Sequence, residues 1–192
     1  MIAALNQRLF VIRRIKNHIP KEQIKKLVDS LWMSKMRYGL QLCTKVRLDE
    51  EERKTYNMKR TQIAQNKMLR MMENCRIRDR KSVKEMLERN EMMSVNQVAA
   101  QIKITEAWKA VNDEKYPVSM KRVEQGNHDG RREVRPETRR GLEEGGRTKI
   151  ARESFVRDAG RIWNQAPTQI KTAKTIEEAK RKIKEYCKAL PI

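Results

Sequence analysis

The side chains with the clearest chemical potential are seven basic residues near the start of the chain. They are Arg8, Arg13, Arg14, Lys16, Lys21, Lys25 and Lys26. Basic side chains on a helical hairpin can contact successive phosphates along a duplex without reading any base. The other interpretation is an ordinary solvated polar face. We favour phosphate contact, since the charge is distributed unevenly along the chain.

Aromatic residues beside this cluster could add base stacking, which is how many proteins hold single-stranded nucleic acids. The candidates are Phe10, Trp32 and Tyr38. Aromatic residues make up only 5% of the chain, so this signal is weak. For each of the three we expect burial in the core.

Residue patterns that support catalysis are nearly absent. Two-metal polymerase chemistry requires carboxylates that converge on magnesium, usually from adjacent Asp residues at a strand turn, and the chain has no Asp-Asp pair. The acidic run at 49–52 has no strand–turn context, and we expect it to be solvated and to begin a helix by complementing its dipole. A Walker A loop and a GxSxG motif are missing too. The sequence therefore predicts a protein that is not an enzyme.

Metal ligands and cofactor motifs are equally scarce. Cys43, Cys75 and Cys187 are far apart, and neither His18 nor His128 completes a familiar ligand spacing with them. We expect no metal, no cofactor and no small-molecule substrate. The odd cysteine count favours a reduced, intracellular location, in the nucleus or cytoplasm. No signal-peptide pattern and no apolar run of about 20 residues is present, so no membrane partner is expected.

The charge of the chain points to a polyanionic partner. Its 192 residues include 45 Lys and Arg against 25 Asp and Glu, a formal net charge of +20. Residues 1–47 carry +9 of this charge, residues 154–192 carry +5, and residues 61–90 carry +4. A positive field of this size favours nucleic acid through counterion release. Its main source is the first two expected helices.

Apolar periodicity predicts an all-α fold. Helices are expected over 3–18, 21–37, 55–74 and 95–112, residues 154–165 regain apolar side chains, and a last helix begins at Thr175. In the second helix, Ile24, Leu27, Val28 and Leu31 recur at i, i+3, i+4 and i+7, which is typical of a buried stripe.

Several finer features follow from the same patterns. Tyr38-Gly39 is expected to end the second helix, with a short loop or strand after it. Ile63, Leu69 and Met72 are expected to point inward from the 55–74 helix. Capping boxes are expected at Ser82, Ser94 and Thr175. Helix 95–112 has apolar residues on more than one side, which predicts the most buried helix, and Trp108 and Trp163 are expected to anchor the core.

The chain is expected to have three parts. Residues 1–112 form a helical bundle and residues 154–192 a small C-terminal helical unit. Between them, residues 113–153 combine Gly, Pro and dense mixed charge with almost no apolar side chains. Such a segment cannot bury enough surface to offset its ordering entropy. We therefore expect residues 113–153 to be a flexible charged linker.

Three blocks of the chain resemble one known family. The first block, residues 8–42, contains Tyr38 and Gly39. The second comprises residues 65–72 and 93–110. The third, residues 154–192, contains Trp163, Asn164 and Pro167 ahead of a basic closing helix. Their order and spacing are similar to the thumb and post-thumb region of non-LTR (LINE-type) retrotransposon reverse transcriptases, in which a helical thumb ends in a Tyr-Gly pair.

The resemblance implies a thumb-like helical bundle that binds a template–primer type duplex of RNA or DNA. It also implies a parent RNA-directed DNA polymerase whose catalytic palm, with paired aspartates, is missing from this chain and would be its packing partner. Two other interpretations stay open. The chain could be a protein-interaction module that uses its Met-rich apolar faces, or a decayed fragment with no selected function.

The missing carboxylate pair predicts that the isolated chain has no polymerase activity. Primer extension with purified protein, a primed template and magnesium should give no product above background. Extension by the full chain that persists after repurification would contradict this expectation.

Overall fold

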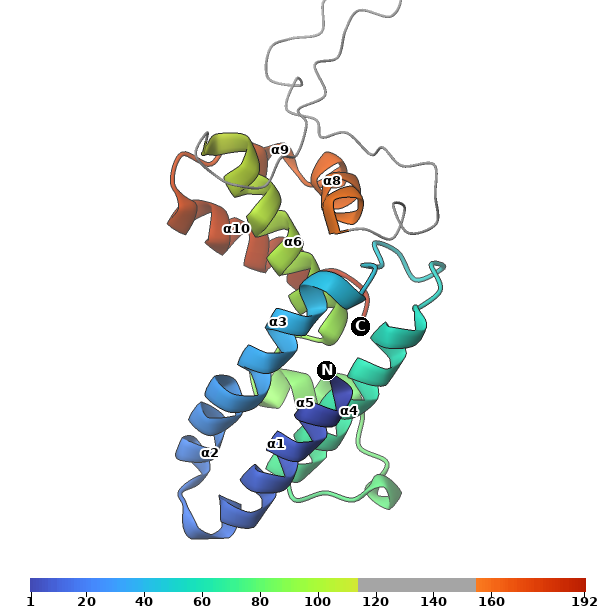
Figure 1. The fold of residues 1–192 in the computed structure, drawn as a ribbon, viewed down its shortest axis with the longest axis vertical. Coiled ribbons are helices and arrows are strands. Elements are labelled where there is room, and N and C mark those ends of the chain that lie inside the picture. The colour runs from blue at the N-terminus through green and yellow to red at the C-terminus, as the bar shows by residue number, and fades with distance from the viewer. Residues whose placement is uncertain (114–154) are drawn as a thin grey trace, which may run out of the picture. The chain divides into compact units, whose positions relative to one another are not determined.

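The computed structural model describes residues 1–113 and 155–192, except for the side chains of residues 42, 43, 156 and 157. Every regular element in these ranges is helical, which confirms the expected all-α fold (Figure 1). Apart from residue 113, the expected linker lies outside the described residues. The chain divides into two compact units, one of Met1–Ala99 with Pro191–Ile192 and one of Ala100–Leu190. This division falls inside the 95–112 helix, whereas the sequence pattern suggested a boundary after it.

The first unit is a bundle in which α1 packs against α4, α3 and η2 (Figure 1). Met residues supply much of the core, including Met36, Met58, Met68 and Met86, which are at most 1% exposed. The elements are α1 (Ile2–Ile15), η1 (Lys16–His18), α2 (Lys21–Leu27), η2 (Val28–Met33), α3 (Ser34–Cys43), α4 (Tyr56–Met72), η3 (Ile77–Asp79), α5 (Val83–Arg89) and the start of α6 (Val95–Asn112).

A π-helical turn, η2, joins α2 to α3 without a break and changes which residues face the core. Ile24 and Val28 are buried as expected, but Leu31 is 37% exposed. A π turn inserts one extra residue into the α-helical spacing. Trp32 therefore takes the inward position that an uninterrupted α-helix would have given to Leu31, and Trp32 is fully buried.

The expected helix end at Tyr38-Gly39 was wrong. Helix α3 continues through both residues to Cys43, and the chain leaves the helix only at Thr44. Gly39 lies where the Met1 side chain crosses the helix, and a Cβ added there would collide with Met1 Sδ. Gly39 thus lies against the Met1 side chain inside a continuing helix, with no left-handed cap involved.

The acidic run and one apolar position also differ from expectation. Residues 49–52 form bends, and α4 begins later, at Tyr56, where the Thr55 hydroxyl accepts a hydrogen bond from Met58 N at 3.4 Å. Leu69 and Met72 are buried as expected, whereas Ile63 is 54% exposed. The helical repeat places Ile63 on the side of α4 opposite its buried residues.

Two buried side-chain amides fasten the start of α6 inside the first unit. Gln65 donates to Met93 O at 2.8 Å and accepts from Val95 N at 3.1 Å. Asn96 accepts from Arg47 N at 2.8 Å and donates to Arg47 O at 2.9 Å. Each amide thereby satisfies backbone groups that no helix or strand partner reaches.

The three expected capping boxes have different outcomes. Ser94 forms a full box, because its hydroxyl accepts from Gln97 N and the Gln97 amide accepts from Ser94 N. Thr175 precedes the first residue of its helix, and its hydroxyl accepts from Glu178 N, but the Glu178 carboxylate accepts from Lys174 N. Ser82 precedes α5 without a side-chain capping bond.

The second unit contains the rest of α6 with α8 (Phe155–Gln165), α9 (Thr168–Lys171) and α10 (Ile176–Lys188), where α9 packs against α10. The helix bounds at 95–112 and from Thr175 agree with the sequence pattern. Ala179 and Ile183 are buried on α10 as expected, while Ile176 and Tyr186 are only half-buried.

A buried ion pair joins α6 to α8. Lys103 Nζ lies 2.6 Å from Asp158 Oδ2, and the two side chains are 1% and 3% exposed. Arg161 adds a second cation, with Nη2 at 3.0 Å from Asp158 Oδ1. Burial lowers the pKa of Lys103, and the Asp158 carboxylate opposes that shift. Neither charge could be left alone in this environment at low cost.

The ion pair generates a double-mutant test. Lys103→Met and Asp158→Leu should each lower the free energy of unfolding by roughly 3–5 kcal/mol, because each leaves a buried charge without its main partner. The double variant should be destabilised much less than the sum of the two. Urea unfolding of the four proteins measures the coupling, and single variants as stable as the parent would contradict it.

The two expected tryptophan anchors are both buried, with Trp163 fully enclosed and Trp108 8% exposed. Trp163→Ala should lower the free energy of unfolding by roughly 3–5 kcal/mol through the cavity it creates. Tyr56→Ala is the matched control, because the Tyr56 side chain is 70% exposed and its removal should change thermal stability little. Equal melting temperatures for the Trp163 variant and the parent would show that this side chain is no anchor.

Candidate nucleic-acid interface

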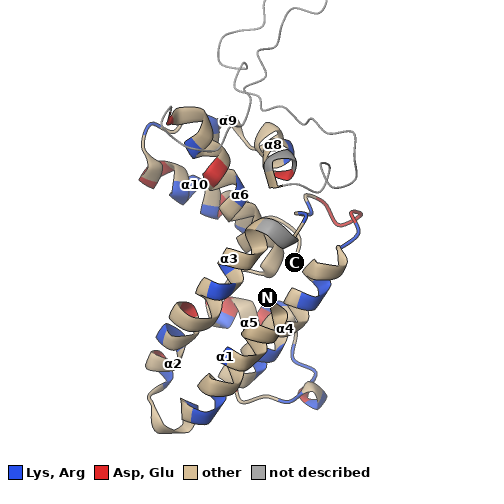
Figure 2. Ribbon diagram, viewed as in Figure 1, with Lys and Arg blue, Asp and Glu red and all other residues tan. Residues whose placement is uncertain are grey.

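The seven basic residues singled out in the sequence lie on two consecutive helices and the turn between them. Helix α1 ends at Ile15 with Arg13 and Arg14 in its last turn, and η1 follows directly. Pro20 adopts an extended conformation, with ψ at 150°, so that α2 begins one residue later. Figure 2 shows basic segments along both helices. The turn therefore brings basic residues from the end of α1 and from α2 to one end of the first unit.

Two of the seven are engaged in holding this unit together. The Arg8 guanidinium donates from α1 to the Leu31 carbonyl in the π turn. Lys16 Nζ donates to the side-chain oxygen of Asn74 and lies 3.5 Å from the Met71 carbonyl, which connects η1 to the end of α4. We assign Arg8 and Lys16 a structural task first, with any phosphate contact secondary.

Lys25 is partly neutralised by an acidic side chain. Its Nζ lies 2.8 Å from Glu91 Oε2, with side chains 42% and 82% exposed. An ion pair this exposed to water contributes little to stability and exchanges readily with solvent or another anion.

The remaining four residues are the candidate contacts. Arg13, Arg14, Lys21 and Lys26 are all exposed. Arg14 lies over the ring of Phe10, with 4.7 Å between the guanidinium carbon and the ring centroid. A stacked guanidinium keeps its full charge and its N–H groups for an anion while the ring restricts its motion. Arg14 is consequently the best positioned of the four.

The expectation that the aromatic residues near this cluster are buried was correct for one residue and wrong for two. Trp32 is fully buried, but Phe10 is 55% exposed and Tyr38 is 69% exposed. Tyr38 has Lys35 over its ring at 5.5 Å. Both exposed rings therefore pair with a cation from the same helix, a role that apolar periodicity cannot indicate.

Helix α4 carries further exposed basic residues that the sequence analysis missed. Lys59, Arg60 and Lys67 are exposed on this helix, which packs against α1, and Arg60 lies 5.5 Å from the centroid of the Tyr56 ring. Helical periodicity could have indicated them, because they fall on the face of α4 opposite its buried residues. The loop 76–80 adds Arg76, Arg78 and Arg80, all exposed.

The terminal helix carries a competing basic surface in the second unit. Lys180, Arg181 and Lys184 are exposed on α10. Lys182, by contrast, is 2.6 Å from Glu178 Oε1 and donates to Gln169 O at 3.2 Å. Lys188 is exposed as well, so four cations of this helix face solvent.

Chemistry other than charge is hard to assign to the described part of the chain. Within residues 1–113 and 155–192, no cluster of three or more His, Cys, Asp or Glu side chains could hold a metal ion. Burial raises the pKa of the Cys187 thiol to about 12, so the thiol is protonated at neutral pH and is a poor nucleophile. None of the helices described is long and apolar enough to cross a bilayer.

Comparison of the chain with protein-family models, with curated proteins and with solved structures finds no match.

Proposed function

We propose that this chain is a non-catalytic nucleic-acid-binding segment, of the kind that forms the thumb and post-thumb region of a retrotransposon RNA-directed DNA polymerase, and that it holds a duplex through phosphates. The observation that carries the proposal is the set Arg13, Arg14, Lys21 and Lys26. These four cations are exposed at the end of one bundle and come from two helices anchored on a shared core.

Anchoring matters because fixed helices already hold the backbone positions of these cations, so binding requires no ordering of the backbone. The helix pair is fixed from both sides, by the Arg8 bond to Leu31 and by the Lys16 bond to Asn74. Lysine and arginine contacts to phosphate supply affinity and carry no base information. The binding that follows from this surface is tight at low salt, weak at high salt and indifferent to sequence.

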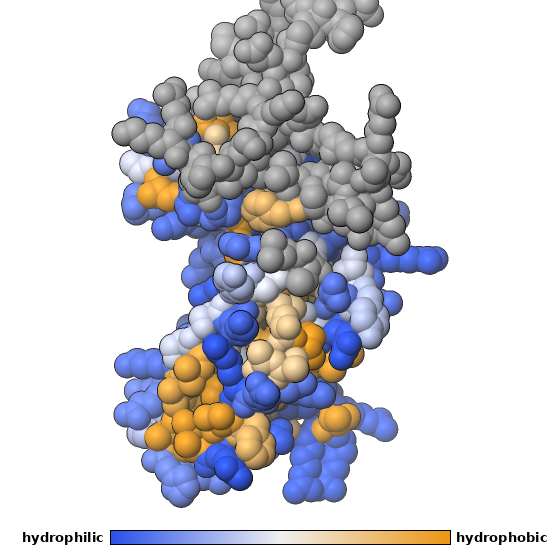
Figure 3. Space-filling model, in the orientation of Figure 1, coloured by the Kyte–Doolittle hydropathy of each residue, from blue (hydrophilic) through white to orange (hydrophobic). Residues whose placement is uncertain are grey.

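A second candidate function, docking to another protein, is favoured by a different observation. Phe10, Val11 and Leu31 are 55%, 50% and 37% exposed on α1 and η2, and Figure 3 shows apolar residues gathered over this region of the bundle. An apolar surface of this kind is typical of an interface with a further protein, such as a polymerase palm. Salt separates the two functions, because apolar docking does not weaken steeply as salt rises.

The proposal predicts that Arg13, Arg14 and Lys26 together supply phosphate contacts. Changing all three to Gln should weaken binding to every duplex alike. It should also reduce the slope of log affinity against log salt by roughly 0.9 for each phosphate that the variant no longer neutralises on a B-form duplex. Fluorescence anisotropy with two unrelated DNA duplexes and an RNA–DNA hybrid, over a range of salt concentrations, measures both effects.

The matched control changes Lys180, Arg181 and Lys184 to Gln, which removes the same number of charges from exposed positions on α10. We expect this variant to bind nearly as well as the parent. If the α10 variant does not bind duplex while the α1–α2 variant binds normally, the phosphate contacts belong to α10. No salt-dependent binding by the parent chain would refute the function itself.

A further inference from the structure

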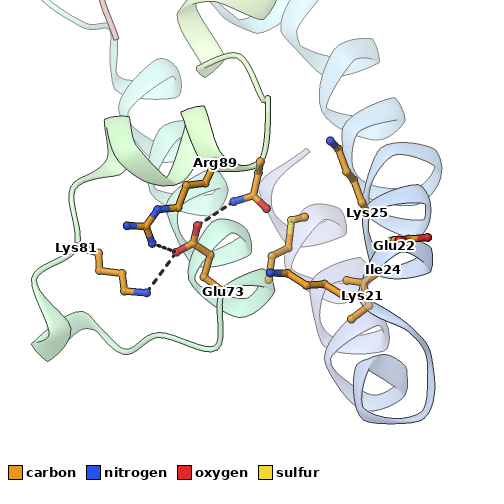
Figure 4. Close-up of a pocket in the computed structure, with 9 residues that line it drawn as sticks. Lys21, Glu22, Ile24, Lys25, Glu73, Lys81 and Arg89 are labelled. Carbon is orange, nitrogen blue, oxygen red and sulfur yellow. Dashed lines mark hydrogen bonds and ion pairs between the residues drawn. The ribbon is translucent and has the colours of Figure 1, made fainter.

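A cavity of about 470 Å³ opens in the first unit between α2 and the α4–α5 connection (Figure 4). Its charged lining consists of four cations, Lys21, Lys25, Lys81 and Arg89, and two carboxylates, Glu22 and Glu73. The cations come from three separate parts of the chain, namely α2, the segment before α5, and α5. Only the tertiary structure brings them to one cavity.

The floor of this cavity is an organised charge cluster. The Glu73 side chain is 8% exposed, and its Oε2 lies 3.4 Å from Lys81 Nζ and 3.6 Å from Arg89 Nη1. Its other oxygen accepts a hydrogen bond from Asn90 Nδ2 at 3.1 Å. One buried carboxylate thus orients two cations, which stay 36% and 60% exposed toward water. Glu73 places these cations and neutralises only half of their charge.

Lys21 supplies a third cation from across the cavity. Figure 4 shows its side chain extending from α2 toward the side occupied by Glu73. Glu22 lines the cavity from α2, but Figure 4 shows its side chain directed away from Glu73, and Lys25 is paired with Glu91. The charged groups available to a ligand in the cavity are therefore the cations Lys21, Lys81 and Arg89 and the carboxylate of Glu73.

We propose that this cavity binds a phosphate monoester, specifically the terminal phosphate of a nucleic-acid strand; the identification of the strand rests on the proposed function. Three cations around one carboxylate leave two positive charges uncompensated. A monoester carries about −1.5 to −2 at neutral pH, so it matches this excess better than a backbone diester with one charge. The cavity volume is also within the range of small-ligand sites, large enough for a phosphate with its sugar.

Arg89 gives the site its geometric preference. Its guanidinium is held by one long contact to Glu73, so most of its N–H donors are available for phosphate oxygens. Lys81 and Lys21 act as point charges on either side. A terminal phosphate exposes three oxygens to such a cluster, whereas a diester exposes two.

The test measures the affinity of the full chain for one duplex sequence with hydroxyl, 5′-phosphate or 3′-phosphate ends. We expect the parent to bind one phosphorylated form about fivefold more tightly than the hydroxyl form. Lys21→Gln and Arg89→Gln should remove this preference. Lys84→Gln should keep it, because Lys84 is exposed on α5 and does not line the cavity.

Lys21→Gln is the decisive variant, since the Lys21 side chain is exposed and its replacement should disturb folding little. Equal affinity of the parent for all three duplexes would overturn the proposal while leaving the proposed function intact. A preference that persists in both cavity variants would overturn it as well, because the strand end would then be read elsewhere.

A separate arm uses inorganic phosphate and does not depend on duplex binding. At constant ionic strength, replacing chloride with phosphate should raise the melting temperature of the parent, and the rise should be smaller in Lys21→Gln. If no duplex binds and phosphate still stabilises the parent through Lys21, the proposed function fails and the anion site stands. If phosphate gives the same shift in both proteins, the site is refuted.

Discussion

The second unit depends on a buried ion pair between two segments that are far apart in the sequence. Lys103 and Asp158 are almost completely enclosed, and burial of either charge alone would cost several kcal/mol. Their contact therefore constrains where α8 can lie against α6. Arg161 adds a second cation beside Asp158, and its side chain is 17% exposed. In a chain with 38% apolar and 36% charged residues, this pair lets two charged side chains be buried in the second unit.

The first unit also has few apolar residues, and it is stabilised by hydrogen-bonded side-chain amides and by methionines in its core. The Gln65 and Asn96 side chains form hydrogen bonds with backbone groups near helix ends, where those groups lack a backbone partner. Such bonds are directional, so they specify one arrangement where a thin apolar core would tolerate several. The methionines fill irregular space between the helices, a task that their flexible thioether suits. The basic surface is therefore built on a bundle whose helix ends are fixed.

Fixed helix ends explain why the basic residues do not all have equivalent roles. Arg8 and Lys16 use hydrogen bonds to hold the bundle itself, Arg14 is restrained by the ring of Phe10, and Arg13 and Lys26 are simply exposed. Their charge alone does not distinguish these residues from one another. Contacts with neighbouring residues separate those that stabilise the bundle from those available to bind phosphate. On α10, the ion pair with Glu178 sets Lys182 apart from the exposed cations in the same way.

The sequence by itself determined the all-α fold, the positions of most helices and the excess of positive charge. These properties depend on local periodicity, on capping residues such as Ser94, and on composition, all of which can be read along the chain. Ile63 shows the limit of that reading, because one apolar residue does not reveal which side of a helix the core will occupy.

Only the tertiary structure decided the register after the π turn, the continuation of α3 through Gly39, and the exposure of Phe10 and Tyr38. It alone also brought Lys21 to the same cavity as Arg89. The physical reason is common to all of these features. Each depends on which face of a helix the rest of the fold covers or on which distant segment lies beside it, and the free energy of that packing belongs to the packed groups together and to neither residue alone.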